Sequence, residues 1–270
     1  MGTIKNYLCS KYAYSMAKFV DNVLIVENKL LSGDFCVIEV EATVKLPDFK
    51  PGQFAQLKVD NSPETFLRRP ISIHDVNMER NRFKMLVQVI GKGTETLYRL
   101  KAGNYLNIIA PLGNGFSLPE KDERIILIGG GTGVAPLLFL GKHLKNNGFK
   151  PEFLLGFRNI ERVILTDEYG SVGPVHITTE DGSLGEKGFV TDHSVLLDKN
   201  IDRIYCCGPD AMMKAVAKHC IDNNIVCEVS LENLMACGYG VCLCCVVDSV
   251  RGNVCTCTEG PVFNVKELKW

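Results

Sequence analysis

The chain lacks an excess of charge of either sign. Its 270 residues include 30 Lys and Arg against 31 Asp and Glu, which gives a formal net charge of -1. Proteins that bind nucleic acid or anionic membrane surfaces through their overall charge need a basic excess, so the composition favours neither partner. We therefore expect no nucleic-acid partner, and other partners have to be recognised at particular sites.

Long apolar runs are missing as well. No stretch approaches the roughly 18 apolar residues that a membrane-spanning helix needs. The N-terminal segment MGTIKNYLCSKYAYSMAKFV has no continuous apolar core of the kind found in secretory signals. We therefore expect a soluble, cytoplasmic protein without a membrane partner. Its 46% hydrophobic residues and 25 glycines are typical of α/β or α+β globular proteins.

Residue patterns typical of hydrolases and of histidine-bound metals are also absent. The five histidines are scattered, without metal-ligand spacing and without a paired Ser and Asp arrangement. The chain has no internal repeat and no low-complexity linker. We therefore predict no catalytic side chain and look for function in segments that bind cofactors.

The pattern of apolar residues divides the chain into regions. Residues 19–120 hold many short strand-like segments separated by Gly, Pro, Asp and Asn turns, which predicts an antiparallel barrel or sandwich. In residues 121–225 apolar strands alternate with helices, which predicts a doubly wound parallel sheet that binds ligands at the carboxyl ends of its strands. Residues 226–270 are cysteine-rich and predict a small third module. Residues 1–18 fit none of these patterns and are expected to form a tail.

Most of the twelve cysteines are crowded into the last quarter of the chain. Cys237, Cys242 and Cys245 have the C-x4-C-x2-C spacing of plant-type [2Fe-2S] ferredoxins, which take their fourth ligand from a distant thiolate. Cys255 and Cys257 are both candidates for that fourth ligand. A four-thiolate zinc site is the alternative, although zinc usually takes C-x2-C knuckles in pairs.

Three segments of the predicted barrel together indicate a flavin nucleotide site. FLRRPISI places an arginine before Pro-Ile-Ser at a strand start, where a guanidinium and a hydroxyl can bind a pyrophosphate. VIGKGTETL follows, and its Gly91, Gly93 and Thr94 can offer backbone amides and a hydroxyl to the same phosphates. GNYLNIIAPLGNGF is a further turn-rich stretch.

Two segments of the predicted parallel sheet indicate a nicotinamide dinucleotide site. IGGGTGVAPLL ends a strand in glycines and opens a helix, so that a dinucleotide phosphate can approach the helix N-terminus. CCGPDAMM stands at the corresponding end of a later strand, where its cysteine and glycine are expected close to the nicotinamide ring. The residues predicted to bind the dinucleotide are Gly130, Gly131, Thr132, Gly133, Cys207 and Gly208.

The chain resembles the ferredoxin-NADP+ reductase superfamily and, within it, the electron-transfer subunits of class 1B dihydroorotate dehydrogenases. The resemblance covers residues 19–270 and rests on the segments RRPISI, GKGT, PLGNGF, GGGTGVAPL, EDGSLGEKGFVTD, CGPDAMM, MACGYGVCLCCV and CTEGPVF. It implies FAD, a [2Fe-2S] cluster and NAD as cofactors, and it selects Cys257 over Cys255 as the fourth cluster ligand. It also implies that FAD is contacted by Arg69, Pro70, Ile71 and Ser72. The backbone of Leu86, Val87 and Gln88 is expected to line the flavin, and Gly93 and Thr94 are expected to hold its phosphates.

The same resemblance implies a partner, an FMN-containing catalytic subunit that oxidises dihydroorotate to orotate in pyrimidine synthesis, in a heterotetramer of two copies of each subunit. A nicotinamide exchanges two electrons as hydride and an iron-sulfur cluster exchanges one, so a flavin has to stand between them. The expected function is to pass electrons from the partner's FMN through [2Fe-2S] and FAD to NAD+.

Two alternatives remain at this point. One is an NAD(P)H-dependent flavin and iron-sulfur reductase subunit with another partner, and the other is a non-enzymatic zinc-binding module. Arg158 follows the second apolar strand of the nucleotide domain and fits either a 2′-phosphate or an adenosine phosphate. The choice of NAD over NADP therefore rests on the resemblance.

Overall fold

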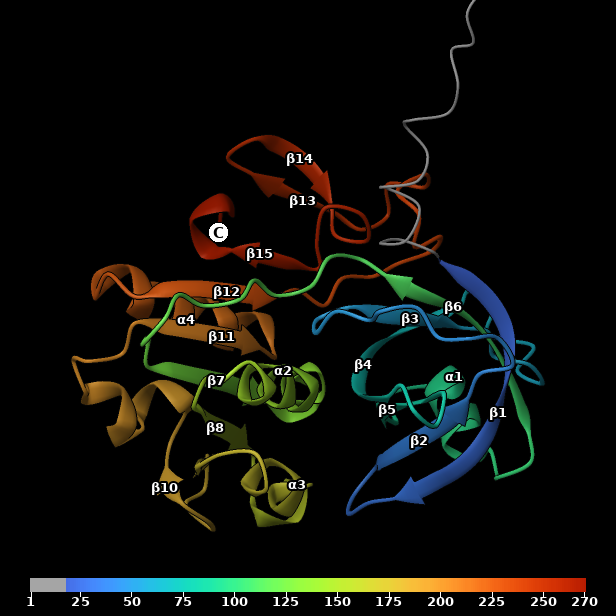
Figure 1. Ribbon diagram of the computed structural model, residues 1–270, viewed down its shortest axis with the longest axis horizontal. Helices are drawn as coiled ribbons and strands as arrows, with labels where there is room; N and C mark the ends of the chain where they lie inside the picture. The colour runs from blue at the N-terminus through green and yellow to red at the C-terminus, as the bar shows by residue number, and fades with distance from the viewer. Residues whose placement is uncertain (1–17) are drawn as a thin grey trace, which may run out of the picture.

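The computed structural model describes residues 18–270, so the predicted tail lies outside the described residues except for Lys18 (Figure 1). Six antiparallel strands close into a barrel in the order β1-β2-β5-β4-β3-β6. This confirms the predicted barrel and decides against a sandwich. The barrel comprises β1 (Phe19–Leu30), β2 (Phe35–Glu41), β3 (Phe54–Leu57), β4 (Arg69–Asn77), β5 (Arg82–Gln88), β6 (Tyr105–Leu112) and the short helix α1 (Lys92–Tyr98).

The second sheet has seven strands in the order β10-β9-β8-β7-β11-β12-β15. Its strand pairs are parallel except for the last, in which β15 runs antiparallel to β12. The sheet confirms the predicted parallel architecture. Its strands are β7 (Ile125–Gly130), β8 (Pro151–Phe157), β9 (Val175–Thr179), β10 (Glu186–Lys187), β11 (Arg203–Cys207), β12 (Val226–Ser230) and β15 (Val262–Asn264).

Helices cover both faces of this sheet because its central strands are apolar on both sides. In β7, Ile125 and Leu127 pack in the same core as α2 (Ala135–Asn146), whereas Ile126 and Ile128 pack in the core that contains α4 (Asp210–Asp222). Helix α3 (Thr166–Gly170) lies beside α2. No helix within residues 18–270 is long and apolar enough to cross a membrane. The 3-10 helices are η1 (Gly131–Val134), η2 (Ile160–Arg162), η3 (Val190–Asp192), η4 (Ser194–Leu197) and η5 (Val265–Glu267).

Helix α2 joins the sheet to the barrel. In Figure 1 it lies between β7 and the barrel, and it packs against both β7 and β4. His74 of β4 is fully buried, and its Nδ1 donates to the carbonyl oxygen of Ala135 at 2.7 Å. Lys142 forms an ion pair with Asp75 at 2.6 Å. The strand that carries the RPIS segment is therefore fixed to the start of the helix that follows the GGGTG segment.

The cysteine-rich segment packs on both the barrel and the sheet. It contains a two-stranded hairpin of β13 (Val246–Ser249) and β14 (Gly252–Cys255), and it ends with β15 at the edge of the large sheet. Strand β12 begins directly after residue 225, where we predicted the module to start, and it also belongs to that sheet. The C-terminal segment contacts the chain just after β6: the backbone N–H of Asn114 donates to the carbonyl of Gly260 at 2.6 Å.

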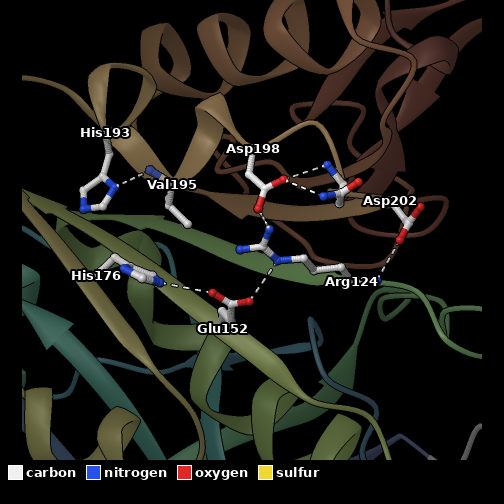
Figure 2. Close-up of polar contacts among 8 residues, drawn as sticks. Arg124, Glu152, His176, His193, Val195, Asp198 and Asp202 are labelled. Carbon is white, nitrogen blue, oxygen red and sulfur yellow. Dashed lines mark hydrogen bonds and ion pairs between the residues drawn. The ribbon is translucent and has the colours of Figure 1, made fainter.

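A polar network ties the amino ends of the parallel strands together, at the edge opposite to the glycine-rich turns (Figure 2). Arg124, just before β7, forms an ion pair with Asp198 and donates from Nε to Glu152 of β8 at 3.0 Å. His176 of β9 contacts the other oxygen of Glu152 at 3.1 Å, and the Arg124 backbone N–H donates to Asp202 at 2.8 Å. Burial opposes ionisation of Glu152, but the bonds from Arg124 and His176 outweigh it and lower its pKa. These groups stabilise strand ends and lie away from the predicted cofactor residues.

Candidate functional site

A cavity of about 590 Å³ opens where the barrel, the parallel sheet and the segment before the cysteine loop meet. Ten of the sequence-predicted residues line it: Arg69, Pro70, Ile71, Ser72, Leu86, Gln88, Gly91, Gly93, Thr94 and Thr132. The structure thus brings the RPIS, GKGT and GGGTG segments together around one space. The Val87 side chain is buried in the barrel core, so only the backbone of Val87 is left for the predicted flavin contact.

Local geometry explains how the GKGT segment faces the RPIS strand. A Cβ atom on Gly93 would lie 2.9 Å from Nε of Arg69, so glycine lets the guanidinium lie against the start of α1. The Thr94 hydroxyl accepts the backbone N–H of Ile90 at 2.9 Å and donates to the carbonyl of Gly91 at 3.0 Å. Thr94 therefore holds the turn closed, and backbone groups of this turn face the cavity.

The predicted dinucleotide residues gather at the carboxyl ends of β7 and β11. A Cβ atom on Gly133 would lie 2.3 Å from the carbonyl oxygen of Cys207, so the η1 turn approaches the end of β11 too closely for any side chain. The Cys207 side chain is fully buried, and burial raises the pKa of its thiol well above the ordinary value. Thr132 of this turn and Ala135, just after it, line the cavity. The predicted dinucleotide segment and the predicted flavin cavity therefore share a wall.

The four predicted cluster ligands lie in two pairs. Cys237 contacts Cys242, and Cys245 contacts Cys257. Backbone amides donate to the sulfurs: Tyr239 N–H to Cys237 at 3.3 Å and Gly240 N–H to Cys257 at 3.1 Å. No three His, Cys, Asp or Glu side chains of residues 18–270 are arranged to bind a single metal ion. Two thiolate pairs with amide donors fit a two-iron cluster, which shares four thiolates between its irons.

The predicted cluster ligands differ in burial and in the pKa of their thiols. The hydrogen bond from the Tyr239 backbone lowers the pKa of the Cys237 thiol to about 6, whereas burial raises the pKa of Cys257 to about 12. Cys255 is also buried and also contacts Cys245, so both candidates for the fourth ligand lie beside the third. The Gly240 N–H is directed at Cys257, which favours Cys257. Cys244 is exposed.

One lining segment escaped the sequence analysis. Residues 230–235, SLENLM, run from the end of β12 to the cysteine loop and line the cavity. Met235 is buried with the cysteines, and Leu234 is exposed. The position of this segment, between the end of an apolar strand and the cysteines, is the signal that could have identified it.

The chain matches two protein-family models. Residues 232–269 match the iron-sulfur cluster binding domain of dihydroorotate dehydrogenase B, and residues 127–218 match the oxidoreductase NAD-binding domain. The first match covers all four predicted cluster ligands and favours the cluster over zinc. The second covers the GGGTG and CGPD segments.

Curated relatives resemble the chain over nearly its whole length. The electron transfer subunit of dihydroorotate dehydrogenase B (NAD(+)) from Clostridium acetobutylicum is 37% identical over 262 residues, which cover 96% of this chain and 98% of the relative. The subunit of the same description from Clostridium perfringens is 38% identical over 260 residues, 95% of this chain and 98% of the relative.

Solved structures give the same architecture. The NADH-dependent reduced ferredoxin-NADP oxidoreductase structure, studied for flavin-based electron bifurcation, superposes with a TM-score of 0.83 at 29% identity and covers 92% of this chain and 90% of that one. The ferredoxin reductase of carbazole 1,9a-dioxygenase, at 18% identity and a TM-score of 0.68, shares the fold and covers 78% of this chain and 68% of that one.

Sequence, fold and relatives agree on the cofactors and on the kind of protein. FAD, a [2Fe-2S] cluster and NAD are the cofactors, as the sequence predicted, and the chain is an oxidoreductase component that transfers electrons. The residues assigned to each cofactor stay predictions. With relatives more than 30% identical along almost the entire chain, the protein belongs to the family of dihydroorotate dehydrogenase B (NAD(+)) electron transfer subunits.

Proposed function

We propose that this chain works with a separate FMN-containing catalytic subunit, which oxidises dihydroorotate to orotate, and that it delivers the electrons to NAD+ in pyrimidine synthesis. The proposal includes a heterotetramer with two copies of each subunit and a cytoplasmic location. Its support is the description shared by the relatives. When bound, the cluster and FAD supply the exchange between one-electron and two-electron transfer.

The observation that carries the proposal is the contact between the cysteine module and the barrel. Phe54 of β3 lines the cavity and also packs in one buried cluster with Leu112, Met235 and the thiols Cys245 and Cys257. Met235 likewise lines the cavity and packs with the thiols. Phe54 and Met235 therefore lie between the predicted flavin site and the predicted cluster site, which supports direct electron exchange within one chain.

We assign the cofactor residues on the same basis. Arg69, Ser72 and the turn at Gly93 bind the flavin nucleotide, the η1 turn binds the dinucleotide, and the two thiolate pairs bind the cluster. We also propose that the nucleotide domain runs from residue 121 to residue 230 and takes in β15, and that the cluster module begins at residue 231. This division keeps β12 with the sheet to which it is hydrogen-bonded.

We propose that the catalytic subunit covers the outer side of the cysteine loop. Two large apolar side chains of this loop are exposed, with exposed fractions of 82% for Val241 and 62% for Leu243. Apolar side chains grouped on a surface loop mark protein interfaces. Because this loop carries three of the four proposed cluster ligands, Cys237, Cys242 and Cys245, a partner seated here would place its own cofactor close to the cluster.

The interface is tested by co-purification of the two subunits. In Val241→Asp and Leu243→Asp, a carboxylate would have to be desolvated in the interface, so we expect at least a tenfold loss of affinity for the catalytic subunit. Leu197→Asp is the matched control, since Leu197 is 80% exposed and lies in η4, away from the loop. Equal binding by all three variants would remove the loop from the interface.

The role of the cluster is tested with Cys242→Ser. We expect this variant to lose dihydroorotate-dependent reduction of NAD+ in the assembled complex and to keep most of its NADH-dependent reduction of a small artificial acceptor. An unchanged rate from dihydroorotate to NAD+ would contradict the proposed route.

The fourth ligand is tested by iron analysis. Cys257→Ser is expected to lose the [2Fe-2S] absorbance and most of its iron, whereas Cys255→Ser is expected to keep about two irons per chain. Both thiols are buried beside Cys245, so both variants remove a sulfur from the same surroundings. The reverse result would make Cys255 the ligand.

A second candidate function follows from the structural comparison. The NADH-dependent reduced ferredoxin-NADP oxidoreductase shares fold and length with this chain at 29% identity, so a ferredoxin-linked reductase with another partner subunit is the competing proposal. Reconstitution separates the two. Dihydroorotate:NAD+ activity that depends on an FMN subunit supports the first proposal, and reduction of ferredoxin or NADP+ without dihydroorotate activity supports the second.

A further inference from the structure

Gln56 is a buried polar residue without a hydrogen-bond partner for its side chain. It has no exposed surface, and neither Oε1 nor Nε2 finds a partner among the described residues. Leaving both ends of a carboxamide unpaired in the interior is costly, and such groups in native proteins generally pair with water, an ion or a ligand. The side chain therefore calls for a partner that residues 18–270 do not supply.

The position of Gln56 on β3 shows where that partner lies. Ala55 and Leu57 point into the barrel core, so Phe54 and Gln56 lie on the opposite face of the strand. That face is covered by the cysteine module, because Phe54 packs with the buried thiols. An outward-facing glutamine has thus been buried by a segment about 180 residues further along the chain.

The nearest part of that module is the ligand loop. A Cβ atom on Gly238 would lie 3.1 Å from Cγ and 3.2 Å from Nε2 of Gln56, so the carboxamide lies against the residue that follows Cys237. Gly238 has a φ of 74°, a left-handed conformation that favours glycine. A side chain at this position would be strained, and it would also push the loop away from Gln56.

The surroundings on the barrel cannot satisfy the carboxamide. Pro70 and Ile109 are the neighbours of Gln56 on the adjacent strands, and both have apolar side chains. Arg68 donates to the main-chain carbonyl of Gln56 at 3.3 Å and directs its other bonds to Asn107, so it leaves the carboxamide free. The neighbour that remains is the loop at Gly238, which carries the proposed cluster ligands.

We propose that the Gln56 side chain donates an N–H hydrogen bond to a sulfur of the [2Fe-2S] centre and thereby raises the reduction potential of that centre. Hydrogen bonds to cluster sulfurs stabilise the more negative reduced state, and outer groups of this kind tune metal centres. Gln56 belongs to the barrel and acts on the cluster directly through this hydrogen bond. This inference rests on the cluster ligands proposed above.

The test compares Gln56→Met with the wild-type chain in the complete two-subunit complex. Methionine has a similar length and no donor, so we expect iron content to stay the same, the midpoint potential of the cluster to fall and the electron paramagnetic resonance spectrum of the reduced cluster to change. Lys58→Met is the matched control, because Lys58 is two residues along the same strand direction, exposed and paired with Asp60. We expect its potential to equal that of the wild type.

A second measurement needs no variant. In wild-type protein labelled with nitrogen-15 at glutamine side chains, the reduced cluster is expected to show a hyperfine coupling to that nitrogen in electron spin echo spectra. Full iron content with an unchanged potential in Gln56→Met and no such coupling would overturn the role of Gln56 alone. A wild-type chain that binds no iron would overturn this role together with the ligand assignment.

Discussion

The close approach of η1 to the end of β11 yields a quantitative prediction for Gly133→Ala. The new methyl group would lie 2.3 Å from the carbonyl oxygen of Cys207 and 2.4 Å from Cα of Gly208. Both are backbone atoms, so no side-chain rotation can relieve the overlap, and one segment has to move by about 1 Å. Overpacking of this kind costs about 1–3 kcal/mol, and the backbone contact places this variant near the upper limit. For a chain of this size that lowers Tm by roughly 5–10 °C.

The functional effect of the same substitution is expected to exceed the loss of stability. Thr132 continues from this turn into the cavity wall, so a shift of η1 moves the dinucleotide segment relative to the flavin cavity. A misplacement of about 1 Å can cost on the order of 100-fold in rate. We expect stopped-flow reduction of the bound flavin by NADH to slow by at least tenfold, while the [2Fe-2S] absorbance stays the same.

The control for Gly133→Ala is Gly170→Ala at the end of α3. A Cβ atom there would meet nothing within 4 Å, and Gly170 has no positive φ. We expect Tm and flavin reduction to match the wild type. A Gly133→Ala protein that melts within about 2 °C of the wild type and reacts normally with NADH would refute the steric reasoning.

Three further variants test how the fold is held together. Burial lowers the pKa of His74, so the folded state favours its neutral form: its contribution to stability is present above about pH 6.5 and is lost as the pH falls below that value toward the folded pKa. We expect denaturation midpoints of His74→Met to decline less than those of the wild type between about pH 7 and pH 5. Glu123→Ala removes the ion-pair partner of Arg203; the Glu123 side chain is 15% exposed and that of Arg203 is 10% exposed. We expect urea denaturation to show that the free energy of unfolding falls by about 3 kcal/mol. Tyr169→Phe removes a buried hydroxyl that donates to a backbone carbonyl at 2.7 Å, and the expected loss is about 1 kcal/mol.

Each of these three predictions would be contradicted by a particular result. Parallel pH profiles for His74→Met and the wild type would assign the acid sensitivity to other groups. For the ion pair, Asp222→Ala is the control, because its partner Lys218 is 78% exposed and such pairs contribute less than about 1 kcal/mol. Equal losses for Glu123→Ala and Asp222→Ala would mean that burial does not strengthen the first pair. An unchanged Tm in Tyr169→Phe would mean that another group satisfies the carbonyl.

The fold class was predictable because it depends on local patterns. The run of apolar residues in β7 predicts burial on both faces, and the two faces do pack in different cores. Short strands between turn residues likewise predicted the barrel. The pairing of β15 with β12 was not predictable, because β15 has three residues and its partner lies about 30 residues earlier. Three residues are too few to show a period.

The site was predictable at the level of segments and less so at the level of individual roles. The GGGTG segment predicted a phosphate approach, but the closest constraint on Gly133 comes from Cys207, more than 70 residues later in the chain. In β3 the polar Gln56 alternates with the apolar Ala55 and Leu57, and on that local basis Gln56 would be expected to face solvent. Its burial depends on a module at the other end of the chain, which no local pattern encodes.

The seven-stranded sheet ends in very short strands on both sides. One edge is β10, with two residues, and the other is β15, with three. A longer edge strand would offer a row of unpaired main-chain N–H and C=O groups to which another chain could add a strand. Here there is almost no such row, so this sheet is poorly suited to grow by strand addition. A subunit that docks on an edge of this sheet therefore has to recognise side chains more than main chain, and an unrelated chain with an exposed strand finds few main-chain groups there with which to pair.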